Sequence, residues 1–283
     1  MRSQVETQLV DHSDHIVVSS HREKVEMVWN YNASSEKISV IPCGVDPDLF
    51  TPRDALKSKV QLNLPPRRFI LFVGRIDPVK GIDTLLKAMA LVKNKLANGK
   101  GVKLLIIGGD IDNSDYSKDS EMQRLKQLTD RLNLKNTVTF LGAQRQDQLP
   151  YFYSASELCV LPSRYESFGM VALEAMACGT PVIASKVGGL TSFIQDETTG
   201  FLVPEEDEKY LAEKILTLLN DQSLKNRLGI KARSRAREFS WQNIARQMIS
   251  LYQQLLDERD NNSREQADPS FHATESNHAA LNP

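Results

Sequence analysis

The stretch FILFVGRIDPVKGIDTLLKAMALVKNKL, residues 69–96, shows the two patterns that decide the fold. It begins with a short apolar run, residues 69–73, which is typical of a buried strand. Beyond a polar turn, apolar side chains recur at the three- and four-residue spacing of one helix face. They belong to Ile82, Leu85, Leu86, Met89, Val92 and Leu96. A strand followed by an amphipathic helix is the repeating unit of a parallel sheet.

The same alternation of apolar runs and helical segments continues on both sides of this unit. We therefore predict an α/β protein whose main part is a doubly wound, parallel-sheet, Rossmann-like domain. A second crossover helix is indicated by the spacing of Met122, Leu125, Leu128 and Leu132. Further strands are expected at residues 15–19, 38–41, 103–107, 137–141, 158–161, 182–184 and 201–203.

Changes in composition divide the chain into four parts. Residues 1–60 end in a Pro- and Asp-rich linker, PCGVDPDLFTPRD, and are too few for a second domain of the same kind. Residues 61–239 hold most of the strands and form the Rossmann-like domain. In residues 240–258, an N-cap serine precedes an apolar stripe that predicts one more helix. Residues 259–283 are polar and are expected to be disordered.

Charge and cysteine content argue against several classes of protein. The 35 Lys and Arg residues nearly balance the 36 Asp and Glu residues, so the net charge of -1 does not indicate nucleic-acid binding. Cys43, Cys159 and Cys178 contain no CxxC pair and predict neither a disulfide framework nor a zinc site. No apolar run approaches the ~20 residues that span a bilayer. The first residues lack the apolar core of a signal peptide, so we expect a cytoplasmic protein.

Ligands of doubly wound sheets bind beyond the carboxyl ends of the strands. Glycine follows several predicted strands there, which would let a backbone approach a ligand closely. Arg75 and Lys80 lie in the loop after the first of these strands, where two cations and free N–H groups suit a diphosphate. The alternative for this loop is a solvated turn with two surface charges.

The segment ESFGMVALEAMACG, residues 166–179, favours a ligand site over that alternative. From Phe168 it predicts a helix whose first N–H groups would hold an anion. Glu174 falls inside the apolar run, and a buried carboxylate needs a hydrogen-bond donor. A ribose or sugar diol would serve, and a salt bridge is the alternative. Glu166 precedes the helix and would overhang the same pocket.

Together these residues resemble the retaining GT-B glycosyltransferases of the group 1 type, or family four. Glu166 and Glu174 match the Glu-x7-Glu motif of that family. The similarity runs in family order from about Asp14 to Leu256 and implies the C-terminal, donor-binding half of a GT-B fold. Residues 1–60 would be a remnant of the acceptor domain, and residues 240–258 the crossover helix. Further matching residues are Gly74, Arg75, Lys80, Gly81, Gly108, Gly109, Gly179, Thr180, Pro181, Val182, Gly188, Gly189 and the segment 199–203.

The resemblance implies a role for each matching residue. Arg75 and Lys80 would hold the diphosphate of the donor, Glu174 its ribose, and Glu166 the hydroxyls of the sugar, which is transferred with retention. Glu166, Arg75 and Lys80 would be the catalytic residues. The base would lie near Arg145 and Leu149. The donor site would also include Gly74, Gly109, Phe168, Gly169, Met170 and Val171.

Similarity to the branch with sucrose-phosphate synthases and the inositol-phosphate glycosyltransferase of mycothiol synthesis implies a UDP-sugar donor. No cofactor is expected, and no metal either, although Asp46 and Asp48, like Asp110 and Asp112, spell the short DxD pattern. The acceptor is an unknown sugar, sugar phosphate or lipid. A lipid acceptor would bring the chain to the inner face of the membrane, where a basic cluster in residues 225–237 could contact anionic lipid. The favoured interpretation of that cluster is a solvated helix face.

Because acceptor binding needs a second domain, we expect little transfer by this chain alone. A separate acceptor-domain chain or self-association would then cover the crossover helix, which is expected to expose Trp241, Ile244, Met248 and Tyr252. The main alternative is a stand-alone or inactive nucleotide-sugar binding module. A sugar-nucleotide epimerase would also need two domains, and a nicotinamide dehydrogenase is disfavoured because no G-x-G-x-x-G follows a strand.

Overall fold

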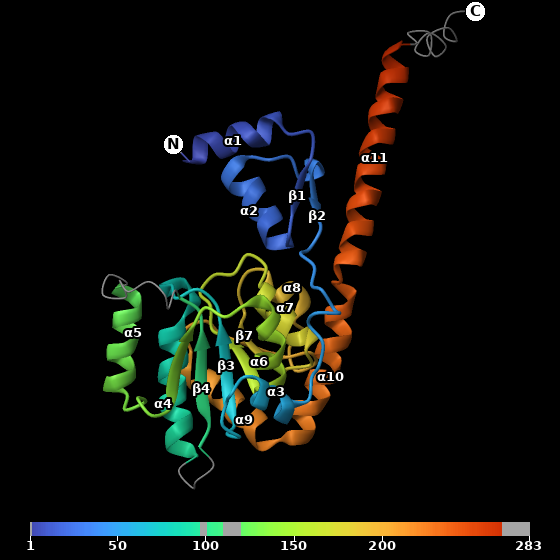
Figure 1. The fold of residues 1–283 in the computed structure, drawn as a ribbon. Helices are drawn as coiled ribbons and strands as arrows, with labels where there is room; N and C mark the ends of the chain where they lie inside the picture. Colours follow the sequence, from blue (N-terminus) through green and yellow to red (C-terminus); the bar gives the residue numbers. More distant parts are fainter. Residues whose placement is uncertain (1, 97–100, 110–119, 268–283) are drawn as a thin grey trace, which may run out of the picture.

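A computed structural model describes residues 2–96, 101–109 and 120–267 (Figure 1). Its main body is a parallel six-stranded sheet in the order β5-β4-β3-β6-β7-β8. The order reverses between β3 and β6, which is the switch point where such sheets bind ligands. The predicted doubly wound α/β domain is thus confirmed. The strands are β3 (Phe69–Val73), β4 (Lys103–Ile107), β5 (Val138–Gly142), β6 (Leu158–Leu161), β7 (Val182–Ser185) and β8 (Phe201–Val203).

Helices cover both faces of this sheet, which explains the continuous apolar runs of its strands. Along β3, Ile70 and Phe72 face a core shared with α4 and α9, whereas Phe69 and Leu71 face a core shared with α6, α7 and α10. The helices of the body are α4 (Ile82–Lys95), α5 (Ser120–Arg131), α6 (Leu149–Ala155), α7 (Met170–Ala177), α8 (Leu190–Phe193), α9 (Glu208–Asn220) and α10 (Gln222–Glu238), with 3-10 turns η2 (Pro78–Lys80) and η3 (Gln146–Gln148).

The first residues form a small unit of their own, drawn in blue in Figure 1. Two short strands pair in parallel, and Val10, Val18, Ala33 and Ile38 form a separate apolar cluster beneath two helices. The elements are α1 (Arg2–His12), β1 (Ile16–Val18), α2 (His21–Tyr31), η1 (Ser35–Lys37) and β2 (Ile38–Val40).

The linker joins the body earlier than the sequence suggests. Phe50 packs on Tyr153 of α6 with ring centroids 6.2 Å apart, and α3 (Ala55–Gln61) contacts α6 as well. The packed body therefore begins before residue 61, because helix-on-helix packing recruits a segment whose own apolar pattern is weak.

The last helix, α11 (Trp241–Ala267), continues past residue 258, where the sequence analysis ends it. The added segment has Ala267 as its single apolar residue, but it contains no glycine or proline that would break the helix. The rest of the predicted disordered tail, 268–283, lies outside the described residues. In the part of the chain that the structure describes, none of the helices combines the length and apolarity needed to cross a bilayer.

The apolar stripe of α11 is only half exposed, in contrast to the sequence expectation. Ile244 is 6% exposed and packs with Ile41 and Leu251, and Met248 joins this cluster. Trp241 and Tyr252 remain 50% and 57% exposed. The linker therefore covers one side of the stripe, a contact that helix periodicity cannot predict.

Candidate functional site

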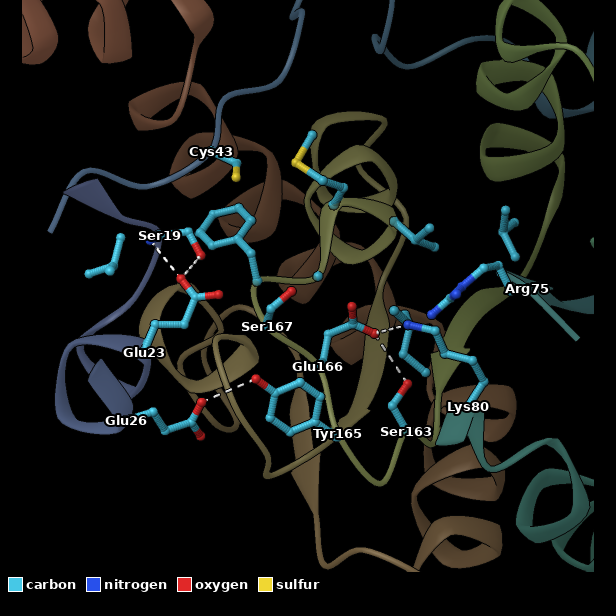
Figure 2. Close-up of a pocket in the computed structure, with 18 of the residues that line it drawn as sticks. Ser19, Glu23, Glu26, Cys43, Arg75, Lys80, Ser163, Tyr165, Glu166 and Ser167 are labelled. Carbon is cyan, nitrogen blue, oxygen red and sulfur yellow. Dashed lines mark hydrogen bonds and ion pairs between the residues drawn. The ribbon is translucent and has the colours of Figure 1, made fainter. Parts of the chain in front are cut away.

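A cavity of about 860 Å³ lies at the carboxyl ends of β3 and β6 (Figure 2). One wall comes from β1 and α2 of the N-terminal unit, and the other comes from the loops after β3 and β6 and the start of α7. The lining includes most of the predicted site residues: Gly74, Arg75, Lys80, Glu166, Phe168, Gly169, Met170 and Val171.

Lys80 and Glu166 form an ion pair on the body side of the cavity. The Lys80 Nζ atom lies 2.6 Å from Glu166 Oε2, and the Ser163 hydroxyl donates to the same oxygen at 3.3 Å. The two side chains are 16% and 14% exposed, so the pair is well shielded from water. Ser163 is a contact that sequence reasoning missed.

Arg75 lines the same cavity and differs from Lys80 in having no ion-pair partner within the described ranges. Its side chain is exposed, and it lies on the same side of the cavity as Lys80 in Figure 2. The cavity therefore holds one neutralised and one unneutralised cation.

The helix α7 begins at this cavity without a side-chain cap. Gly169 occupies the N-cap position with φ of 102°, a conformation that favours glycine, and it has no side chain to accept the first N–H groups. Met170 and Val171, the first residues of the helix, line the cavity. Free N–H groups and the positive end of the helix dipole thus face the space beside Arg75 and Lys80, which is an arrangement that attracts an anion.

Glycines hold the loops of this site against one another. A Cβ added to Gly108 would lie 1.7 Å from the carbonyl oxygen of Gly74, and one added to Gly188 would lie 1.7 Å from that of Glu166. The sequence analysis assigns such glycines to close approach of a ligand. At these two positions the close approach is between loops, so their role is to support the cavity wall.

Glu174 is buried inside α7, 8% exposed, and is not among the residues that line the cavity. The hydroxyl of Tyr153 donates to its Oε2 at 2.8 Å. Burial raises the pKa of Glu174 to about 7, and the hydrogen bond from Tyr153 opposes that rise. The predicted donor therefore exists, but it is a tyrosine of α6 that falls among apolar residues and gives no signal in the sequence.

The N-terminal wall of the cavity is acidic, which the sequence analysis did not anticipate. Glu23 accepts hydrogen bonds from the backbone N–H and the hydroxyl of Ser19, at 2.7 and 2.6 Å. The Tyr165 hydroxyl donates to Glu26 at 3.2 Å and so connects the two walls. Residues 17–31 thus belong to the site.

Other predicted residues lie away from the cavity wall. The carbonyl of Gly109 accepts the Ala143 N–H at 2.7 Å, and Arg145 pairs with Asp147 on the surface at 2.8 Å. Leu149, at the start of α6, is likewise not part of the lining.

The first DxD pattern, Asp46 and Asp48, forms part of a turn. The Asp46 carboxylate accepts the N–H groups of Asp48 and Leu49 at 2.9 and 3.2 Å, as in a simple turn. Asp110 and Asp112 lie outside the described residues. Within the described ranges no three acidic, histidine or cysteine side chains gather as metal ligands would.

Comparison with known proteins places these features in a family. The family model for glycosyl transferases group 1 matches residues 54–235. The chain belongs to this family. It is 38% identical over 253 residues to the D-inositol 3-phosphate glycosyltransferase of Segniliparus rotundus, an alignment that covers 89% of the chain and 54% of the relative.

Solved structures share the fold of this chain. The sucrose-phosphate synthase of Thermosynechococcus elongatus matches with a TM-score of 0.79 and 40% identity over 90% of this chain and 62% of its own. The Anabaena protein HepE in complex with UDP and glucose matches with a TM-score of 0.79 and 25% identity over 89% and 66%. The chain thus spans little more than half the length of the curated relatives it matches, for example 54% and 59% of two of them.

Proposed function

We propose that this group 1 glycosyltransferase chain binds a nucleotide-diphosphate sugar in the cavity at the start of α7. The observation that carries the proposal is the uncapped N-terminus of α7, which opens beside Arg75 and Lys80. The α7 N-terminus, Arg75 and Lys80 each contribute positive potential to this cavity, which suits the two negatively charged groups of a diphosphate. A uridine base is supported by the Anabaena neighbour, which was solved with UDP and glucose.

Donor binding would rearrange the ion pair in the cavity. Because Lys80 already pairs with Glu166, a diphosphate would replace the carboxylate as the partner of Lys80. The Glu166 carboxylate would then be free to accept hydrogen bonds from the hydroxyls of the sugar. Although Glu174 does not line the cavity, its Oε1 atom, which Tyr153 does not use, would be the atom to accept from the ribose hydroxyls.

The proposed reaction moves the sugar from the donor to an acceptor with retention of configuration. The bond from the anomeric carbon to the β-phosphate oxygen breaks, and its electron pair leaves with the nucleoside diphosphate. The acceptor oxygen bonds to the anomeric carbon on the same face, and its proton passes to the departing phosphate. Arg75 and the α7 N-terminus would stabilise the negative charge that develops there. A divalent metal is not required in this proposal, since protein cations supply the countercharge.

Proton NMR of UDP-glucose incubated with the protein, with water as the simplest acceptor, tests the reaction. We expect slow release of UDP together with α-glucose as the first-formed anomer, at a rate unchanged by EDTA. β-Glucose as the first product would overturn retention, and a rate abolished by EDTA would overturn the metal-free proposal. Tight UDP binding with no release of UDP would reduce the function to nucleotide-sugar binding.

A further inference from the structure

A second cavity, of about 670 Å³, lies on the opposite side of the body from the donor cavity. Its wall includes Glu157 and Pro181, which immediately precede β6 and β7, so it opens at the amino ends of the strands. The starts of α3 and α10 complete the wall. Its volume is within the range of small-molecule sites.

The side chains that line this cavity are strongly basic. Arg53, Lys59, Lys225 and Arg233 face a single carboxylate, Glu157. That carboxylate already pairs with Lys225 and, outside the lining, with Arg68 at 3.2 Å. The other three cations of the wall have no ion-pair partner among the residues that the structure describes. The cavity thus carries an excess of positive charge that no protein group offsets.

Two of these cations, Arg53 and Lys59, are partly or largely shielded from water and have polar atoms without a hydrogen-bond acceptor. Lys59 is only 9% exposed, and its ammonium group has no acceptor in the described chain beyond the face of Phe69, 5.8 Å away. The Nε atom of Arg53 is buried and unpaired, while its Nη2 donates to the Leu49 carbonyl at 3.5 Å and its guanidinium stacks 4.3 Å from the ring centre of Tyr151. A shielded polar atom without an acceptor is unfavourable, so the Nε atom of Arg53 and the ammonium of Lys59 favour an anion in this cavity.

We propose that this basic cavity binds a phosphate group, either as free phosphate or as part of a sugar phosphate. A phosphate offers several acceptor oxygens, which suit the ammonium of Lys59 and the planar guanidinium groups of Arg53 and Arg233. The 670 Å³ also leaves room for an organic part.

Arg53 and Arg233 both lie near the thiol of Cys178. Burial raises the pKa of Cys178, and the positive charges of Arg53 and Arg233 oppose that rise. Cys178 lines the same cavity.

A purely structural role for the cations is the competing explanation. The helices α6 and α7 end near this cavity, and the negative end of a helix dipole attracts cations without any ligand. In that case removal of a cation would lower stability and leave no phosphate binding to lose.

Calorimetric titration of the whole 283-residue chain with inorganic phosphate and with glucose 6-phosphate, at constant ionic strength and with saturating UDP, separates the two explanations. We expect binding in the presence of UDP, weakened by about tenfold or more in Lys59→Met and in Arg233→Gln. Arg227→Gln is the matched control, since it removes an exposed cation of α10 outside the lining and should bind as the wild type does.

Each outcome decides the proposal. Binding of inorganic phosphate alone identifies the free ion as the ligand, and tighter binding of glucose 6-phosphate identifies the ester. The proposal would be overturned if neither probe binds or if UDP abolishes the binding. It would also be overturned if Arg233→Gln binds the probes as tightly as the wild type does. If Lys59→Met fails to fold, Arg233→Gln carries the test, because Arg233 is half-exposed. The melting temperature of Arg233→Gln without phosphate then reports any structural role of that side chain.

Discussion

Glu174 is a carboxylic acid whose burial makes the stability of the fold depend on pH. Its pKa is raised to about 7 in the folded chain, against an ordinary value of 4.5. Between these two values the folded state binds more protons than the unfolded state, so stability falls as pH rises through this window. The full effect is about 3 kcal/mol at ~1.4 kcal/mol per pKa unit.

We predict that Glu174→Gln removes most of this pH dependence. The amide keeps the shape of the side chain and its hydrogen bond from Tyr153, but it does not ionise. Urea unfolding at several values between about pH 5 and pH 8 measures the effect. An equally steep loss of stability in wild type and variant would show that another group titrates.

Glu166 pairs with Lys80, and under the proposed function it would compete with the donor diphosphate for that cation. In Glu166→Gln the ammonium loses its carboxylate partner and becomes available, so UDP affinity should be maintained or rise by a few fold. Sugar transfer should fall, because the neutral amide is a weaker acceptor for sugar hydroxyls. Calorimetry and the NMR assay measure the two effects separately. A tenfold loss of UDP affinity would mean that Glu166 positions Lys80 instead of competing for it.

Among the elements of the site, the two loops that carry Lys80 and Glu166 are joined by Arg164. Its backbone N–H donates to the Val79 carbonyl at 2.8 Å. Its guanidinium donates to the Pro78 carbonyl and, at 3.1 Å, to the Asp83 carboxylate. Arg164 does not line the donor cavity, so it acts through the loops. It is a positioning residue for η2.

Arg164→Ala should therefore weaken UDP binding by several fold without removing a ligand contact. In a double-mutant cycle with Lys80→Ala the two losses should be less than additive, because both affect the same loop. Arg227→Ala, which removes an exposed cation of α10 outside the donor cavity, is the control. Full additivity would show that Arg164 contributes only to general stability.

The linker and the start of α11 fit together at a glycine. A Cβ added to Gly44 would lie 2.6 Å from the Trp241 ring, whereas one added to Gly101 would meet nothing within 4 Å. Gly44→Ala should lower the free energy of unfolding by about 1–3 kcal/mol through overpacking. Gly101→Ala should change it by less than ~0.5 kcal/mol. Equal stability of both variants in urea unfolding would contradict this packing.

The elements of the body could be predicted because their signals are local. Consecutive apolar residues predict the strand 69–73, and a run of small and apolar side chains predicts the helix that begins near Phe168. The ends of elements depend on wider contacts. Packing on α6 makes α3 part of the body, and the polar end of α11 stays helical although its composition resembles a disordered tail.

On the scale of the whole molecule, the site lies between two parts of the chain that share no local pattern. The sequence indicates the cationic loops and the helix N-terminus, because motifs within 74–81 and 166–179 hold them. The acidic wall of α2 and the contact of Tyr165 with Glu26 follow from how the N-terminal unit sits over the sheet. Such long-range contacts cannot be read from residue spacing.

The central claim is that Arg75, Lys80 and the start of α7 form a diphosphate site, and titration calorimetry with UDP and with uridine tests it most directly. The account predicts that UDP binds clearly tighter than uridine, and that Arg75→Ala and Lys80→Ala each weaken UDP binding by about 10- to 100-fold while Arg145→Ala does not. Equal binding of UDP and uridine, or equal UDP affinity in wild type and both cavity variants, would contradict the account.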